Sequence, residues 1–147
     1  MRWIRKFFYL PSSQRNLLGK TILLVGIVRL GLWLLPFRTV RYLLGKAIRR
    51  NPQAWSPTEA SINRVVSAVR IASRYVPESS CLTQALAAQT LLVRHGCPAQ
   101  LRIGVARSET GALQAHAWVE YRERIVIGGT DSLLHYIPLP PVDGKSL

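Results

Sequence analysis

Apolar residues in the first two thirds of the chain recur at intervals of three and four positions, the spacing of one buried helix face. Proline interrupts this pattern at Pro36 and Pro77. Thr58, and either Ser79 or Ser80, stand where they can cap the helices that follow them. The pattern therefore predicts one or two helices over residues 16–50, broken near Pro36 into 16–36 and 37–50, and two more over residues 58–76 and 81–95.

After Gly96 the hydrophobic period changes to two, which is typical of half-buried strands. It predicts strands over residues 100–107, 114–121 and 124–127. The two-residue link at Arg122–Glu123 predicts an antiparallel hairpin between the last two of them. The proline-rich tail is expected to be irregular. Helices followed by antiparallel strands predict an α+β fold.

The first predicted helix is apolar on nearly all sides, but Lys20 and Arg29 limit its uncharged run to eight residues. A membrane-spanning helix needs about 20 mostly apolar residues. We therefore expect a buried helix and not a transmembrane one. Residues 51–57 contain two prolines, and we expect the chain to divide there into a helical segment, residues 1–52, and a second domain, residues 53–147.

Charge is distributed unevenly along the 147 residues, which carry a net charge of +13. Residues 1–50 hold eleven of the twenty Lys and Arg residues and no acid, whereas residues 51–147 hold nine basic residues and seven acids. This asymmetry predicts an anionic partner, which is a lipid surface, a nucleic acid or an acidic peptide. Aromatic residues make up only 8% of the chain, and leucines alternate with the basic residues. We therefore expect residues 1–50 to bind an anionic membrane surface and no nucleic acid.

The two cysteines, Cys81 and Cys97, stand at opposite ends of one predicted helix. At about 1.5 Å per residue their separation is roughly 20 Å, which is too long for a disulfide. No CxxC pair or His/Cys cluster is present, so neither a zinc site nor another metal site is predicted. Two free thiols suit a reducing compartment, and we expect a cytoplasmic protein with a peripheral contact to the membrane.

Three residues form a candidate catalytic set. Cys81 opens a helix, where unpaired backbone N–H groups and the helix dipole favour the thiolate, the nucleophilic form of cysteine. His116 lies in the middle of the second strand and can act as the base, and Asp131 is the one acid between the third strand and the tail. The alternatives are a buried structural thiol, a structural histidine and an ordinary turn residue. Trp118 shares a strand face with His116 and either shields it from water or simply belongs to the core.

The segments CLTQALAAQTLLVRHGCPAQLRIGVA, AHAWVEY, IGG and YIPL resemble the transglutaminase-like cysteine peptidases of lasso-peptide biosynthesis. The resemblance covers roughly residues 58–140 and, more loosely, the basic front. It implies a papain-like core with Cys81 as nucleophile and His116 as base. The family's third member is an acid, but residues 127–129 are Ile-Gly-Gly where that acid is expected. Either Asp131 takes the role from a shifted position, or a backbone carbonyl orients His116 instead.

The resemblance also implies a function. These peptidases cut the leader from a ribosomally made precursor before a separate macrolactam cyclase closes the ring. The chain is similar to the stand-alone form, whose leader-binding domain is a separate small protein, and no cofactor is implied. The alternative is a non-catalytic basic module with a structural cysteine, bound to a membrane or to nucleic acid.

Overall fold

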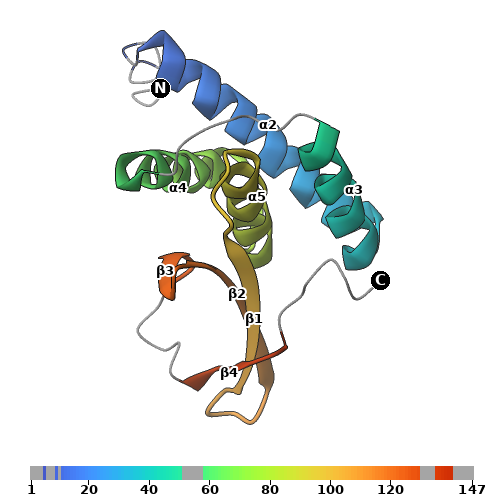
Figure 1. Cartoon of the computed structure of the whole chain (residues 1–147). Helices are drawn as coiled ribbons and strands as arrows, with labels where there is room; N and C mark the ends of the chain where they lie inside the picture. Colours follow the sequence, from blue (N-terminus) through green and yellow to red (C-terminus); the bar gives the residue numbers. More distant parts are fainter. Residues whose placement is uncertain (1–4, 6–8, 10, 51–57, 130–134, 141–147) are drawn as a thin grey trace.

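The computed structural model describes residues 5, 9, 11–50, 58–129 and 135–140, and Figure 1 shows how the helices and strands of that part are arranged. The strands form one antiparallel sheet in the order β3-β2-β1-β4. The predicted α+β class is confirmed. The elements are α2 (Ser12–Leu34), α3 (Phe37–Arg50), α4 (Glu59–Tyr75), α5 (Cys81–Arg94), β1 (Gln100–Arg107), β2 (Leu113–Tyr121), β3 (Arg124–Ile127) and β4 (Ile137–Pro138).

The predicted helix starts are confirmed by their caps. Thr58 precedes α4 and forms a reciprocal pair with Ser61: the Ser61 N–H donates to Thr58 Oγ1 at 3.2 Å, and the Thr58 N–H donates to Ser61 Oγ at 2.9 Å. Ser80 caps α5 by accepting from the Thr83 N–H at 3.3 Å. Because these bonds satisfy N–H groups that have no partner inside the helix, they fix where each helix begins. Pro36 separates α2 from α3, as expected.

The prediction that the first helix is buried is wrong for most of its surface. Four residues of α2 are buried, Leu18, Thr21, Val25 and Val28, and they form a single stripe. The physical reason is position, since α2 packs against α3, α4 and α5 from outside and uses one side to do so (Figure 1). Among the described helices α2 alone is long and apolar enough to cross a membrane, a property that core helices also have.

The central helix is α5, which contacts all three other described helices and strands β1, β2 and β3. Leu86 and Leu92 are buried, and so are the small residues Ala87 and Ala88. Contact on several sides explains why α5 is rich in alanine, because small side chains let neighbouring elements approach closely. Buried Thr90 donates its hydroxyl to the Leu86 carbonyl at 2.7 Å, so its burial leaves no unpaired donor.

The first strand and the β2–β3 hairpin follow the prediction. Arg122 and Glu123 form the link with φ of 49° and 61°, the left-handed conformation that two-residue hairpins favour. The prediction missed β4, in which Pro138 pairs with Gly104 and Ile137 pairs with Val105 of β1. A two-residue strand has no periodicity to recognise, and its proline is tolerated because β4 is the edge of the sheet.

The described helices and the sheet share one hydrophobic core. Val25 and Val28 of α2 and Val40 of α3 belong to the same cluster of buried residues as Leu86 of α5 and Val119 of β2. The segment at which we expected the chain to divide, residues 51–57, lies outside the described residues. The division into residues 1–52 and 53–147 stays a prediction.

Candidate functional site

Cys81 is the first residue of α5, as the sequence predicted. It is a half-buried free thiol that packs against the edge of the core. The first N–H groups of a helix have no partner within the helix, and that of Cys81 is one of them. The cap at Ser80 satisfies another, the N–H of Thr83. Ser79 does not act as the cap, and its buried hydroxyl has no hydrogen-bond partner in the described part of the chain.

His116 lies in β2, and one ring nitrogen is held by the backbone. Its Nε2 lies 2.7 Å from the carbonyl oxygen of Gly128. Because a carbonyl oxygen only accepts hydrogen bonds, Nε2 must carry the proton of this bond. In the neutral ring the lone pair is therefore on Nδ1, which is the nitrogen available to act as a base.

Gly128 follows β3 in a conformation that requires glycine. Its φ is 82°, and a Cβ atom at this position would lie 2.7 Å from the carbonyl oxygen of Ala117 and 3.0 Å from Trp118 Cα. The close approach to β2 sets the position of the Gly128 carbonyl relative to His116. This is the place in the sequence where the family resemblance led us to expect an acid.

Two aromatic rings surround the His116 imidazole. The Trp118 ring is nearly parallel to it, with ring centroids 6.3 Å apart and an interplanar angle of 22°. The Tyr136 ring is tilted, at 5.6 Å. Trp118 is itself only 4% exposed. Of the two interpretations offered for Trp118, the structure favours the first, because the buried ring lies beside the imidazole on the strand face opposite to Ala117 and Val119 of the core cluster.

Trp118 is held by polar contacts that the sequence analysis did not identify. Its Nε1 donates to Glu120 at 2.8 Å, and Arg102 Nε donates to the other oxygen of the same carboxylate at 3.2 Å. Gly104 of β1 pairs in register with His116, and a Cβ on Gly104 would lie 2.8 Å from the Trp118 ring, so only glycine fits there without a shift. The alternation of strand residues predicts that Trp118 and Glu120 share a face, but it gives no sign of Tyr136 or of the Arg102 contact.

The structure places Cys81 and His116 on elements that pack together, α5 and β2. Along β2, His116 and Trp118 point to one face, whereas Ala117 and Val119 point to the other and belong to the core. Within the described residues no hydrogen bond joins the cysteine sulfur to the imidazole. Cys81 packs against the core cluster to which Ala117 and Val119 belong, and the pairing of the two side chains stays a prediction.

Asp131, the third predicted member, lies outside the described residues. Its role stays a prediction. The alternative from the sequence, that a backbone carbonyl orients His116, has a described counterpart in Gly128.

The other cysteine has a different environment. Cys97 is 2% exposed, and burial raises the pKa of its thiol, an effect that nearby Arg122 offsets in part. A buried thiol with a raised pKa is a poor nucleophile at neutral pH. This environment favours a structural role for Cys97 over a catalytic one.

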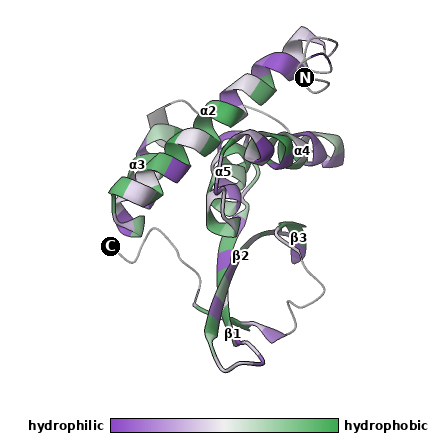
Figure 2. Cartoon of the chain, turned by 180° about the vertical axis from the view of Figure 1, so that it is seen from behind, coloured by the Kyte–Doolittle hydropathy of each residue, from purple (hydrophilic) through white to green (hydrophobic). Residues whose placement is uncertain are grey.

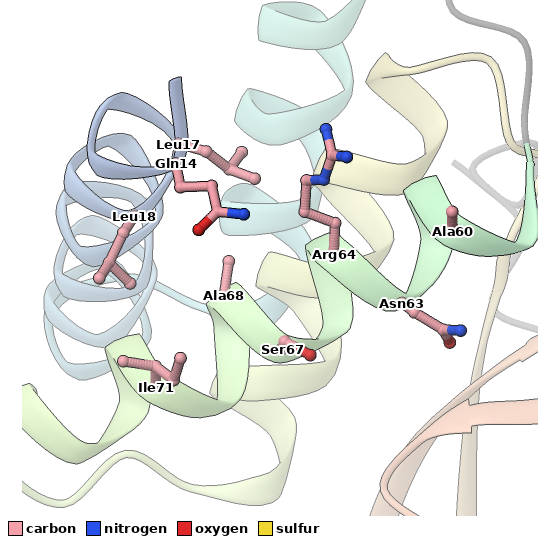
Figure 3. Close-up of a pocket in the computed structure, with 9 residues that line it drawn as sticks. All are labelled: Gln14, Leu17, Leu18, Ala60, Asn63, Arg64, Ser67, Ala68 and Ile71. Atoms are coloured by element: carbon pink, nitrogen blue, oxygen red, sulfur yellow. The ribbon is translucent and has the colours of Figure 1, made fainter. Parts of the chain in front are cut away.

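A cavity of about 340 Å³ lies between the start of α2 and α4, and Figure 3 shows the residues that line it. Its polar lining comes from Gln14, Asn63, Arg64 and Ser67, and its described lining contains no Cys, His, Asp or Glu. Within the described residues no group of three or more potential metal-binding side chains lies close together. The residues with catalytic potential therefore belong to the α5–β2 region and not to this cavity.

A family model described as the transglutaminase-like superfamily matches residues 28–140. The matched range begins at Val28, within the last third of α2, and includes every later described element, so it contains Cys81, His116 and Gly128. No curated protein and no solved structure matches the chain.

Proposed function

Because the chain belongs to the transglutaminase-like superfamily, which includes cysteine peptidases, we propose that it is a cysteine peptidase that cuts lasso-peptide precursors. It removes the leader before a separate cyclase closes the macrolactam ring, and a small leader-binding protein delivers the precursor to it. The leader-removal step and the two protein partners rest on the resemblance of residues 58–140 to the leader peptidases.

The hydrogen bond between His116 and Gly128 is the observation that carries this proposal. By keeping the proton on Nε2, the Gly128 carbonyl leaves Nδ1 to accept a proton from a nucleophile. In a cysteine peptidase an acid or amide side chain performs this task. Here a carbonyl held by a glycine-specific backbone conformation performs it.

The proposed reaction has two steps. His116 Nδ1 takes the proton of the Cys81 thiol, and the sulfur attacks the carbonyl carbon of the last leader residue. The peptide C–N bond then breaks, the core peptide leaves as an amine with the proton from His116, and the leader remains on Cys81 as a thioester. Water, deprotonated by His116, attacks the thioester and releases the leader as a carboxylic acid, which returns Cys81 to its starting state.

The start of α5 supplies the remaining element of this mechanism. The carbonyl oxygen of the substrate becomes an oxyanion when sulfur attacks, and it needs hydrogen-bond donors. The Cys81 N–H is one of the donors that helix geometry leaves unpaired at this end of α5. The proposal requires that the sulfur of Cys81, a residue of intermediate burial, can be reached by a peptide.

The test uses the purified chain with a precursor peptide and the leader-binding protein encoded next to it. Mass spectrometry should detect two products whose masses add to that of the precursor plus one water. Cys81→Ala and His116→Ala should each lower the rate by roughly 10⁴-fold while circular dichroism stays unchanged. Cys97→Ala is the matched control, since it removes the other thiol and should keep the activity.

Two outcomes contradict the proposal. If Cys81→Ala cleaves the precursor at the wild-type rate, Cys81 is not the nucleophile and the structural interpretation of this cysteine is correct. If the wild-type protein leaves the precursor intact although the leader-binding protein is present, the chain does not remove leaders.

A further inference from the structure

The side of α2 that faces away from the core carries a continuous stripe of large apolar side chains. Its members follow each other at helical spacing, and each is more than half exposed: Leu23, Ile27, Leu30, Trp33 and Leu34. We call these five residues the outer face. In Figure 2, the colour along α2 is largely that of hydrophobic residues. An apolar stripe of this length on the surface marks a place where something binds.

A groove continues the outer face toward the interior. It has a volume of about 630 Å³ and lies between α2, α3 and α5, with Leu23 and Ile27 in its wall. Leu24, Leu44 and Leu91 add to its apolar lining. The groove therefore extends the exposed apolar surface into a cavity between three helices.

The rim of this groove is positively charged. Lys20 and Arg94 supply the positive charge, and His95 lies beside them in the lining. Burial, and then the charges of Arg94 and Lys20, lower the pKa of His95, which indicates that these cations lie close enough to repel a further positive charge. An anionic group is the chemistry that this rim favours.

Residues 11–50 contain no acid, and further basic residues lie on α2 and α3. Arg29 is occupied, since its Nη2 lies 2.7 Å from a carboxylate oxygen of Glu78. Arg38 and Lys46 are exposed on α3, and neither forms an ion pair with a described carboxylate. Apolar side chains beside unpaired basic groups are the pattern of helices that lie in the plane of a membrane surface.

We propose that the outer face and its groove dock onto the surface of an anionic bilayer, with α2 parallel to the membrane. The apolar stripe enters the boundary between headgroups and acyl chains, Trp33 lies at headgroup depth, where tryptophan is favoured, and the basic rim contacts lipid phosphates. The helix does not span the bilayer, because Val25 and Val28 on its opposite side are held in the protein core. This inference does not depend on the peptidase function.

Vesicle sedimentation of the full-length chain tests the proposal. The protein should bind vesicles that contain phosphatidylglycerol at low salt and bind weakly to vesicles of phosphatidylcholine alone. Binding should decrease strongly as salt rises to about 0.5 M, because the attraction is screened over a few ångströms. Trp33 emission should shift to shorter wavelength on the anionic vesicles, and this shift should be lost in Trp33→Phe.

Matched variants locate the surface. Ile27→Gln together with Leu30→Gln should weaken binding at least tenfold, whereas Leu113→Gln, at an even more exposed apolar position on β2, should have no effect. Arg38→Gln and Lys46→Gln should each weaken binding roughly fivefold, as expected for one charge near an anionic membrane. The same change at Arg70, an exposed arginine of α4, is their control.

Three results overturn the proposal. If the protein does not bind the anionic vesicles at low salt, the outer face does not dock onto a membrane, and a protein partner is the remaining occupant. Equal loss of binding in the Leu113 control shows that the effect is not specific to α2. Attachment that resists both high salt and an alkaline wash means that α2 inserts across the bilayer.

Discussion

Substitution of Gly128 by alanine separates the positioning of His116 from general stability. At φ of 82° an alanine costs about 1–2 kcal/mol relative to glycine, because its Cβ meets the neighbouring backbone. The Cβ would also lie 2.7 Å from the Ala117 carbonyl oxygen, which is backbone and cannot rotate away. Relieving such a contact lowers the free energy of unfolding by about 1–3 kcal/mol more. The total expected loss of unfolding free energy is about 2–5 kcal/mol.

Gly111 provides a matched control. Its φ is also 82°, but no atom lies within 4 Å of the Cβ that an alanine would add. Gly111→Ala should therefore lose only the conformational part, about 1–2 kcal/mol. In thermal unfolding the two variants should differ by roughly 2–4 °C for each kcal/mol that the clash adds.

The two variants should differ more in activity than in stability. To relieve the clash, Gly128 must move away from β2, and its carbonyl then loses the 2.7 Å hydrogen bond to His116. A displacement of about 1 Å in a catalytic arrangement can lower activity by around 100-fold. We expect that loss of kcat/KM on the precursor for Gly128→Ala and near wild-type kcat/KM for Gly111→Ala, each measured well below its melting temperature.

A second readout does not require the precursor. The rate at which iodoacetamide modifies Cys81 should depend on pH differently in Gly128→Ala, because the base has lost its orienting partner, whereas Gly111→Ala should follow the wild-type profile. The reasoning is refuted if Gly128→Ala unfolds as expected but keeps the cleavage rate and the alkylation profile of Gly111→Ala. The carbonyl would then be a structural acceptor only.

Three further outcomes are expected. Cys97→Ser should keep the cleavage activity and lower the free energy of unfolding by about 1–3 kcal/mol, measured by urea unfolding. Burial raises the pKa of the Cys97 thiol in the folded protein, so the wild-type protein should lose stability as the pH rises above about 8.5. The serine variant should lose less stability over the same pH range. The pKa of His95 is lowered in the folded protein, so on acidification the unfolded chain takes up the imidazole proton first. The free energy of unfolding should therefore decrease as the pH falls below about 6.5. His95→Gln should reduce that decrease, measured by urea titrations across this pH range. Gly104→Ala, whose Cβ would lie 2.8 Å from the Trp118 ring, should lower the unfolding free energy by about 1–3 kcal/mol and change the buried tryptophan's fluorescence, and an unchanged protein would contradict the tight packing.

Local interactions explain what the sequence alone determined. The caps at Thr58 and Ser80, the break at Pro36 and the Arg122–Glu123 hairpin depend on residues within four positions of each other, and each was predictable. The same reasoning placed Cys81 at the start of a helix and His116 within a strand. Hydrophobic period and side-chain chemistry are sufficient for such features, because the partners are neighbours in the chain.

Only the tertiary structure decided which surfaces face the core and which group holds His116. The pattern of α2 is apolar on both sides, and packing against α4 and α5 selected the stripe with Val25 for burial and left the stripe with Trp33 exposed. The acceptor for His116 is a backbone carbonyl twelve residues away, and every residue type has such a carbonyl. Its position depends on the register of β2 with β3 and on the close approach at Gly128, which arise from contacts between segments that no local pattern records.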